Sequence, residues 1–153
     1  MEKDFAGLLH KNQLKITGPR LGVLQVIAQS DAAITQPALE KIMGADVDRV
    51  TLYRILKTFE EKGILHKVID LNGTANYAIC SPRCTVHEHH DEHFHFNCIN
   101  CKKVYCLDDV PLQSIKIPEG FTAKDINLVI SGLCDKCNAE KQPKMPEHQT
   151  AGV

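Results

Sequence analysis

Two Cys-x-x-Cys pairs constrain this chain more than any other feature: Cys98-Ile-Asn-Cys101 and Cys134-Asp-Lys-Cys137. Together they offer four thiolates, which is enough to close a tetrahedral zinc site with no position left for a substrate. A closed site of this kind stabilises a fold and does not catalyse. The sequence therefore predicts one structural zinc per subunit, with residues 102–133 folded back between the two pairs.

The position of the cysteines also bears on the compartment. All seven lie in the second half of the chain, and the first residues, MEKDFAGLLH, have no signal-peptide core. No apolar run approaches the length of a membrane span. We therefore expect a cytoplasmic protein with no membrane partner, because paired cysteines in a reducing compartment usually bind metal. A disulfide framework is the disfavoured alternative.

The charge distribution is compatible with nucleic-acid binding but does not establish it. The 153 residues suit one or two small domains, and the net charge is −1. Residues 1–67 contain ten Lys and Arg against eight Asp and Glu, whereas the remainder contains eight against eleven. A mildly basic first half thus precedes an acidic second half.

The first half has the pattern of a winged helix-turn-helix. Three helix starts, each followed by apolar residues at helical spacing, are predicted at Thr17, Thr35 and Asp48. Gly63 ends the third helix. A hairpin follows, with strands over 64–70 and 75–80 around a tight turn at Asn72-Gly73.

In a winged helix the third helix enters the major groove of DNA. Arginine and lysine neutralise phosphates or donate to guanine, while Tyr and Thr hydroxyls reach phosphates. The pattern alone is equally typical of a solvated helix face. The residues expected to contact DNA are Arg20, Arg49, Thr51, Tyr53, Arg54 and Lys57.

The second half predicts a smaller domain after a hinge. The expected fold class is α+β: a winged-helix domain over 1–80, a hinge loop over 81–92, an α/β dimerisation and metal-binding domain over 93–139, and a disordered tail over 140–153. Within the second domain, strands are predicted over 93–97, 103–107 and 123–131, and one or two helical turns over 108–115.

A second group of ligands stands at the hinge. His93 and His95 are two apart in a strand and share one face. His66 lies in the first wing strand, across the turn from Cys80. Three imidazoles and one thiolate suit Zn²⁺, so these four residues predict an exchangeable, regulatory zinc between the two halves.

Other residues near the hinge leave alternatives open. The loop histidines His87 and His90 are candidates for an additional or replacement ligand. Cys84 and Cys106 are each an alternative ligand, a buried residue or a redox-active thiol.

The chain resembles the ferric uptake regulator family of metal-sensing dimeric bacterial repressors over residues 10–138. The segments that carry the resemblance are LKITGPRLGVL, RVTLYRILKTFEEKGIL, HFHFNCINC and ISGLCDKC. The resemblance implies a homodimer on a palindromic double-stranded DNA operator, a structural zinc in the C-terminal domain, and Tyr53 and Arg54 at the DNA.

Within that family, the chain looks most similar to the zinc uptake regulator branch. That branch has a cysteine at the end of the wing, where Cys80 stands, and a metal ligand at the position of His66. The iron and peroxide branches usually have a histidine where this chain has Ala33, and peroxide sensors an aspartate where it has Cys106. A further family site is in doubt because Ile126 replaces its histidine.

These observations predict a zinc-responsive repressor rather than an enzyme, with no small organic substrate. Iron- or peroxide-responsive regulation is the nearest alternative, with Fe²⁺ in place of the regulatory zinc. A zinc-ribbon interaction module without DNA binding is a third possibility. A zinc hydrolase is disfavoured, because no His-Glu-x-x-His pattern is present.

Overall fold

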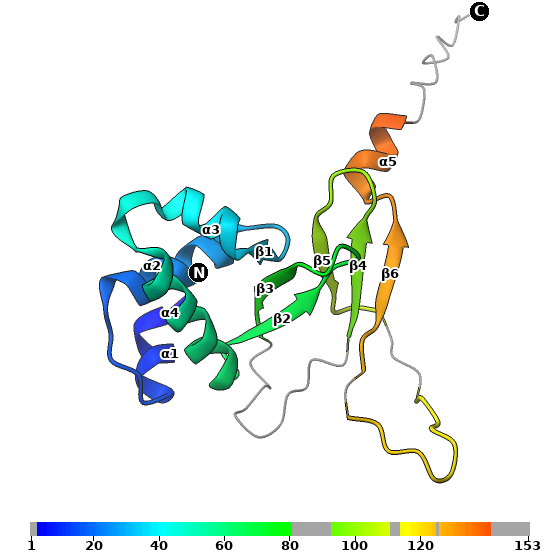
Figure 1. Ribbon diagram of the computed structural model, residues 1–153. Helices are drawn as coiled ribbons and strands as arrows, with labels where there is room; N and C mark the ends of the chain where they lie inside the picture. Colours follow the sequence, from blue (N-terminus) through cyan, green and yellow to red (C-terminus); the bar gives the residue numbers. More distant parts are fainter. Residues whose placement is uncertain (1–2, 81–92, 111–113, 125, 142–153) are drawn as a thin grey trace, which may run out of the picture.

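Two small sheets, each in its own half of the chain, organise the molecule. The computed structural model describes residues 3–80, 93–110, 114–124 and 126–141. In these ranges the helices of the first half lie together on one side of a three-stranded sheet, and a second three-stranded sheet carries one short helix in the second half (Figure 1). The predicted α+β fold class is confirmed.

Side-chain caps start the helices of the first half where the sequence predicts. Thr17, Thr35 and Asp48 accept hydrogen bonds from backbone N–H groups three residues on, at 3.4, 3.3 and 3.0 Å. Such caps satisfy donors that a helix start leaves unpaired. The elements are α1 (Phe5–Lys11), α2 (Gly18–Gln29), α3 (Gln36–Met43), a 3₁₀ turn (Gly44–Asp46) and α4 (Arg49–Glu61).

The wing is a hairpin closed by a carboxylate. Strands β2 (Leu65–Ile69) and β3 (Ala75–Ile79) pair antiparallel, and β1 (Ile34–Thr35) adds to β3. In the turn, Gly73 has φ 78°, a conformation that glycine adopts without a steric penalty. Asp70 accepts hydrogen bonds from the N–H groups of Asn72 and Thr74, both at 2.9 Å. The predicted tight turn is therefore present.

One apolar core holds the first half together. Its centre lies between α4 and the helices and strands that surround it, with Phe59 and Leu52 fully buried. The third helix predicted from the sequence is α4. Its apolar stripe supplies four of the core residues, because positions three and four apart share a helix face. The buried residues are Leu9, Val23, Leu24, Ile27, Leu39, Val47, Leu52, Ile55, Leu56, Phe59, Ile64, Leu65 and Tyr77.

The second sheet mixes strand directions. Strand β4 (Phe94–Cys98) lies in the middle, antiparallel to β5 (Val104–Leu107) and parallel to β6 (Val129–Gly132). Helix α5 (Asp135–Lys141) follows β6 directly. Because β4 and β6 run in the same direction, the cysteine pair that begins at the last residue of β4 and the pair that follows β6 lie at the same end of the sheet.

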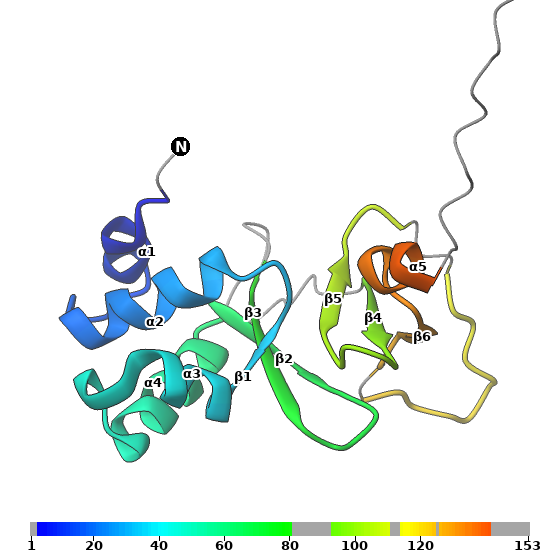
Figure 2. The same cartoon turned by 90° about the horizontal axis from the view of Figure 1, so that it is seen from above.

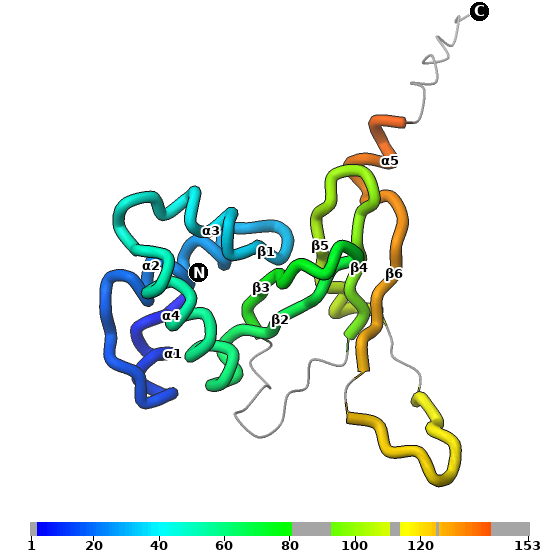
Figure 3. Tube along the Cα trace, in the orientation of Figure 1, coloured from blue at the N-terminus to red at the C-terminus, as the bar shows by residue number. Residues whose placement is uncertain are grey.

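Several sequence predictions for the second half are wrong in extent. The strand predicted over 123–131 is confined to β6, so most of that segment has no regular structure. The described part of 108–115 is a turn at Asp108 rather than a helix, and 111–113 lie outside the described residues. In Figure 3 residues 114–124, drawn in yellow, lie away from the sheet.

The structure also differs from the sequence prediction near both ends of the chain. Helices α1 and α5 were not predicted, and α5 carries regular structure one residue past the expected start of the tail. The predicted hinge 81–92 and the tail beyond residue 141 lie outside the described residues. Among the helices that the structure describes, none combines the length and the hydropathy required to cross a bilayer.

The two halves meet where the wing faces the second sheet (Figure 2). The N–H of Ala33, just before β1, donates to the carbonyl of Val104 in β5 at 2.7 Å, and the two residues form an isolated β-bridge. The two halves are therefore in direct contact through the backbone.

Candidate metal centres and DNA-binding face

The four paired cysteines converge at one end of the second sheet. The ligand atoms of Cys98, Cys101, Cys134 and Cys137 all lie within 4.8 Å of one another. The sulfurs of Cys101 and Cys134 are 3.8 Å apart. Two sulfurs bound to one tetrahedral zinc at about 2.3 Å each are separated by about 3.8 Å. The predicted grouping is present, and its donor set fits zinc.

Local hydrogen bonds prepare these thiols unequally for ionisation. The backbone N–H of Cys134 donates to the sulfur of Cys98 at 3.4 Å and lowers the pKa of Cys98 to about 6. The N–H of Cys137 likewise lowers the pKa of Cys134. A hydrogen bond from Asn100 lowers the pKa of Cys137, but burial and the neighbouring thiols outweigh it and raise that pKa to about 11. Four thiolates therefore coexist here only with a cation between them.

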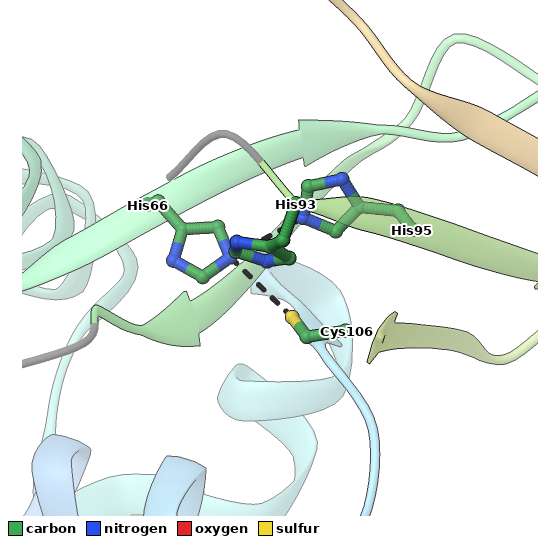
Figure 4. Close-up of side chains that lie close together, drawn as sticks. All are labelled: His66, His93, His95 and Cys106. Atoms are coloured by element: carbon green, nitrogen blue, oxygen red, sulfur yellow. Dashed lines mark hydrogen bonds between the residues drawn. The ribbon is translucent and has the colours of Figure 1, made fainter. Parts of the chain in front are cut away.

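A second group of ligand atoms lies at the contact between the two halves. His66 of β2, His93, His95 of β4 and Cys106 of β5 place one ligand atom each within 4.8 Å of the others (Figure 4). The Nε2 atom of His66 lies 3.5 Å from Nε2 of His95 and 3.4 Å from the sulfur of Cys106. Donors around one tetrahedral zinc, bound at about 2.0–2.3 Å, are separated by similar distances.

Burial and a carboxylate orient this second group. His66 and His95 are each only 9% exposed. Nε2 of His93 is buried and has no hydrogen-bond partner among the described residues, whereas its Nδ1 lies 3.6 Å from a carboxylate oxygen of Asp108. A metal-binding histidine commonly presents one nitrogen to the metal and the other to a carboxylate. The arrangement fits a metal bound through Nε2 of His93.

Three of the four predicted regulatory ligands are brought together, and the thiol in the group is Cys106. Cys80, the predicted thiolate, is buried just after β3, where its N–H donates to the carbonyl of Ile64 at 3.0 Å. It is not a member of the four-residue group. Its ligand role stays a prediction. His87, His90 and Cys84 lie outside the described residues.

The register of the hairpin is a sequence signal for Cys106 and Asp108. The first cysteine pair is the turn of a hairpin, in which Asn97 pairs with Val104 and His95 with Cys106. Continuing the antiparallel register by two residues sets His93 against Asp108. Counting residues outward along both strands from the first cysteine pair therefore indicates Cys106 as the partner of His95 and Asp108 as the partner of His93.

Four of the side chains predicted to contact DNA lie on the exposed surface of α4, and Thr51 and Arg20 are the two exceptions. Tyr53 is 55% exposed, and Arg54 and Lys57 are also exposed. The Arg49 side chain is 84% exposed and lies 3.5 Å from Glu40. Thr51 instead donates its hydroxyl hydrogen bond to Asp48 within the cap. Arg20, on α2, is half-buried and donates to the carbonyl of Lys15 at 2.7 Å.

Basic residues from separate elements border one hollow beside α4. Lys15 and Thr17, which precede α2, border it together with Arg20 of α2, and Thr51 and Arg54 border it from α4. Clustered basic and hydroxyl groups of this kind suit phosphate oxygens of a nucleic-acid backbone.

A winged helix joined through paired metal-ligand groups to a small mixed sheet defines a class of metal-binding DNA-binding proteins. The profile of the Ferric uptake regulator family matches residues 11–131. The chain belongs to this family. Its members are dimeric, metal-responsive, DNA-binding transcriptional regulators and not enzymes, and this chain is one of these regulators.

Curated relatives agree with the family assignment. The chain is 33% identical over 132 residues to the ferric uptake regulation protein of Legionella pneumophila, covering 81% of this chain and 91% of that protein. It is 28% identical over 140 residues to the protein of the same name from Neisseria gonorrhoeae, covering 86% and 92%.

Solved structures share the fold. A zinc uptake regulator complexed with zinc and DNA has a TM-score of 0.62 at 19% identity, covering 89% of this chain and 91% of that one. The Vibrio cholerae ferric uptake regulator has a TM-score of 0.59 at 23% identity, covering 86% and 100%.

Proposed function

We propose that this chain is a cytoplasmic, zinc-responsive repressor whose affinity for its operator rises when zinc binds the group formed by His66, His93, His95 and Cys106. The observation that carries the proposal is the origin of these ligands. His66 belongs to the wing, whereas the other three belong to the second half. One metal shared by all four therefore holds the winged helix in one orientation.

The regulatory effect follows from linkage. A metal that binds the closed arrangement better than other arrangements shifts the population towards the closed one. In a dimer, that arrangement fixes the spacing of the two α4 helices, and DNA half-sites require a fixed spacing. Metal then raises DNA affinity, and DNA raises metal affinity by the same factor, typically about 5- to 150-fold.

The donor set favours zinc over iron. Three imidazoles and a thiolate form a nitrogen and sulfur set, which tetrahedral Zn²⁺ accepts readily. The structural zinc at Cys98, Cys101, Cys134 and Cys137 is the second cofactor in this proposal. It holds the dimerisation domain and is not exchanged during sensing.

Iron is the alternative regulatory metal, because the curated relatives are named ferric uptake regulation proteins. Titration with Fe²⁺ under anaerobic conditions, in parallel with Zn²⁺, separates the two. Operator binding that responds to Fe²⁺ and not to micromolar Zn²⁺ would favour iron sensing.

The decisive experiment combines zinc counting with operator binding. Cys106→Ser and His95→Ala should each lose the exchangeable zinc and the zinc-dependent gain in operator affinity, while both variants keep one structural zinc. Cys80→Ser is the matched thiol variant and tests the ligand predicted from the sequence. If Cys80→Ser abolishes the response and Cys106→Ser leaves it intact, the thiolate of the regulatory site is Cys80.

A further inference from the structure

Asp31 joins the winged helix to both Cys-x-x-Cys turns, residues 98–101 and 134–137, which we call the cysteine knuckles. It lies between α2 and β1, and its two carboxylate oxygens contact different lysines. Oδ1 is 3.2 Å from Nζ of Lys103, and Oδ2 is 2.6 Å from Nζ of Lys136. Lys103 follows the first knuckle and Lys136 lies inside the second. The two hydrogen bonds lower the pKa of Asp31, so the carboxylate is ionised at neutral pH.

A backbone hydrogen bond reinforces the same contact. Two residues after Asp31, the N–H of Ala33 donates to the carbonyl of Val104, the first residue of β5. Charged side chains and backbone thus hold residues 31–33 against the end of the second sheet that carries the cysteines. We refer to Asp31, Ala33, Lys103, Lys136 and Val104 as the clasp.

The clasp and the histidine group contact β5 at different points. The clasp meets it at Val104, and the histidine group meets it at Cys106, two residues further on. A single attachment at a metal leaves the winged helix free to rotate about that point. A second attachment removes this freedom and defines one orientation.

We propose that Asp31 is a positioning residue for metal-regulated DNA binding. Its ion pairs hold the winged helix in the orientation that places His66 beside His93, His95 and Cys106. If the chain responds to zinc as proposed above, the clasp lowers the zinc concentration needed for operator binding. Because both lysines belong to the knuckles, the clasp also requires the four cysteines to be in their folded arrangement.

The expected effects are moderate, because Asp31 and its partners are exposed. Loss of one exposed ion pair corresponds to about a 1.4- to 5-fold change in an equilibrium constant. Asp31→Asn weakens both pairs and should raise the zinc concentration for half-maximal operator binding by about 3- to 10-fold. Lys136→Gln should raise it by about 2- to 5-fold.

The two substitutions change the net charge in opposite directions, so a shared effect cannot come from the overall field of the protein. Asp109→Asn and Lys116→Gln are charge-matched controls at exposed positions of the second half and should leave the zinc response unchanged. In the double variant Asp31→Asn with Lys136→Gln, the shift should be smaller than the product of the single shifts, because one substitution has already removed their pair.

Amide hydrogen exchange tests the clasp separately from the zinc response. In the full chain with its structural zinc, the Ala33 N–H should exchange at least about 3-fold faster in Asp31→Asn than in the wild type. Unchanged exchange at Ala33 overturns the clasp, whatever zinc does. Faster exchange with an unchanged zinc midpoint overturns the positioning role. A wild-type chain whose operator binding ignores zinc contradicts the proposed function and the zinc part of this inference, while Ala33 exchange still decides the orientation part.

Discussion

The two halves of the chain are held together by different forces. In the first half, thirteen buried apolar residues form one core around α4. In the second, the described buried cluster consists of three cysteines, with Phe96, Tyr105 and Leu133 packed against it. Apolar burial stabilises a fold without help, whereas thiols stabilise it mainly when a metal joins them. The first half is therefore expected to fold by itself, and the second to depend on zinc.

The largest difference should appear on removal of the structural metal. Cys134→Ser should lose the structural zinc, because three thiolates leave the site incomplete. The backbone amides of β4, β6 and α5 should then lose their protection from hydrogen exchange. Protection of α4 should persist. Zinc content and hydrogen exchange across the chain measure both effects. Full protection of β4 in a zinc-free variant would contradict the comparison.

A cavity in the apolar core should destabilise the first half and leave the zinc site of the second half intact. Leu56→Ala, at a side chain only 1% exposed, should lower the free energy of unfolding of the first half by about 2–5 kcal/mol. The structural zinc should remain at one per subunit, because Cys98, Cys134 and Cys137 belong to a separate buried cluster. Urea unfolding followed by zinc release measures the two halves separately. Simultaneous loss of zinc and of α4 at one urea concentration would show that the halves unfold as one unit.

Apolar residues of the second half are exposed instead of buried, and they suit the dimer contact. Ile126 is 48% exposed and Ile130 is 40% exposed, on and beside β6, which is an edge strand. Ile130→Lys should therefore weaken dimerisation by about tenfold or more, since it places a charge in an apolar contact. Leu71→Lys is the control, at an exposed apolar position in the wing. Sedimentation at several concentrations gives the dissociation constants, and equal values for both variants would exclude Ile130 from the contact.

The smallest effect concerns the turn of the wing. Burial raises the pKa of Asp70, but the Thr74 N–H, the Asn76 side chain and the Asn72 N–H outweigh it, so the pKa lies below its ordinary value. A lowered pKa contributes stability above the unfolded-state pKa, which is lost as the pH falls through the folded-state pKa. Asp70→Asn should cost about 0.5–1 kcal/mol at pH 7 and progressively less below about pH 4. Urea unfolding at both pH values checks this, and an equal cost at pH 7 and pH 3 would contradict the assigned role of the carboxylate.

The sequence predicts best what short-range chemistry determines. Caps at Thr17, Thr35 and Asp48 mark three helix starts correctly, and the spacing of the cysteine pairs groups all four thiols. Prediction from the sequence fails where contacts between residues far apart in the chain determine the structure. Helix α5 has one buried residue, Cys137, so the knuckle rather than an apolar stripe supports it. Cys106 joins the histidines only because the hairpin sets it opposite His95, which residue types alone do not reveal.

The position of β4 between the two groups implies an order of maturation. This single strand carries His95 near one end and Cys98 at the other, three residues or about 10 Å apart. Its partner β6 leads directly into the second cysteine pair. We expect a newly synthesised chain whose cysteines hold no metal to lack the sheet that places His95 opposite Cys106. We therefore expect such a chain not to sense metal yet, so that metal serves first to build the sensor and only afterwards as its signal.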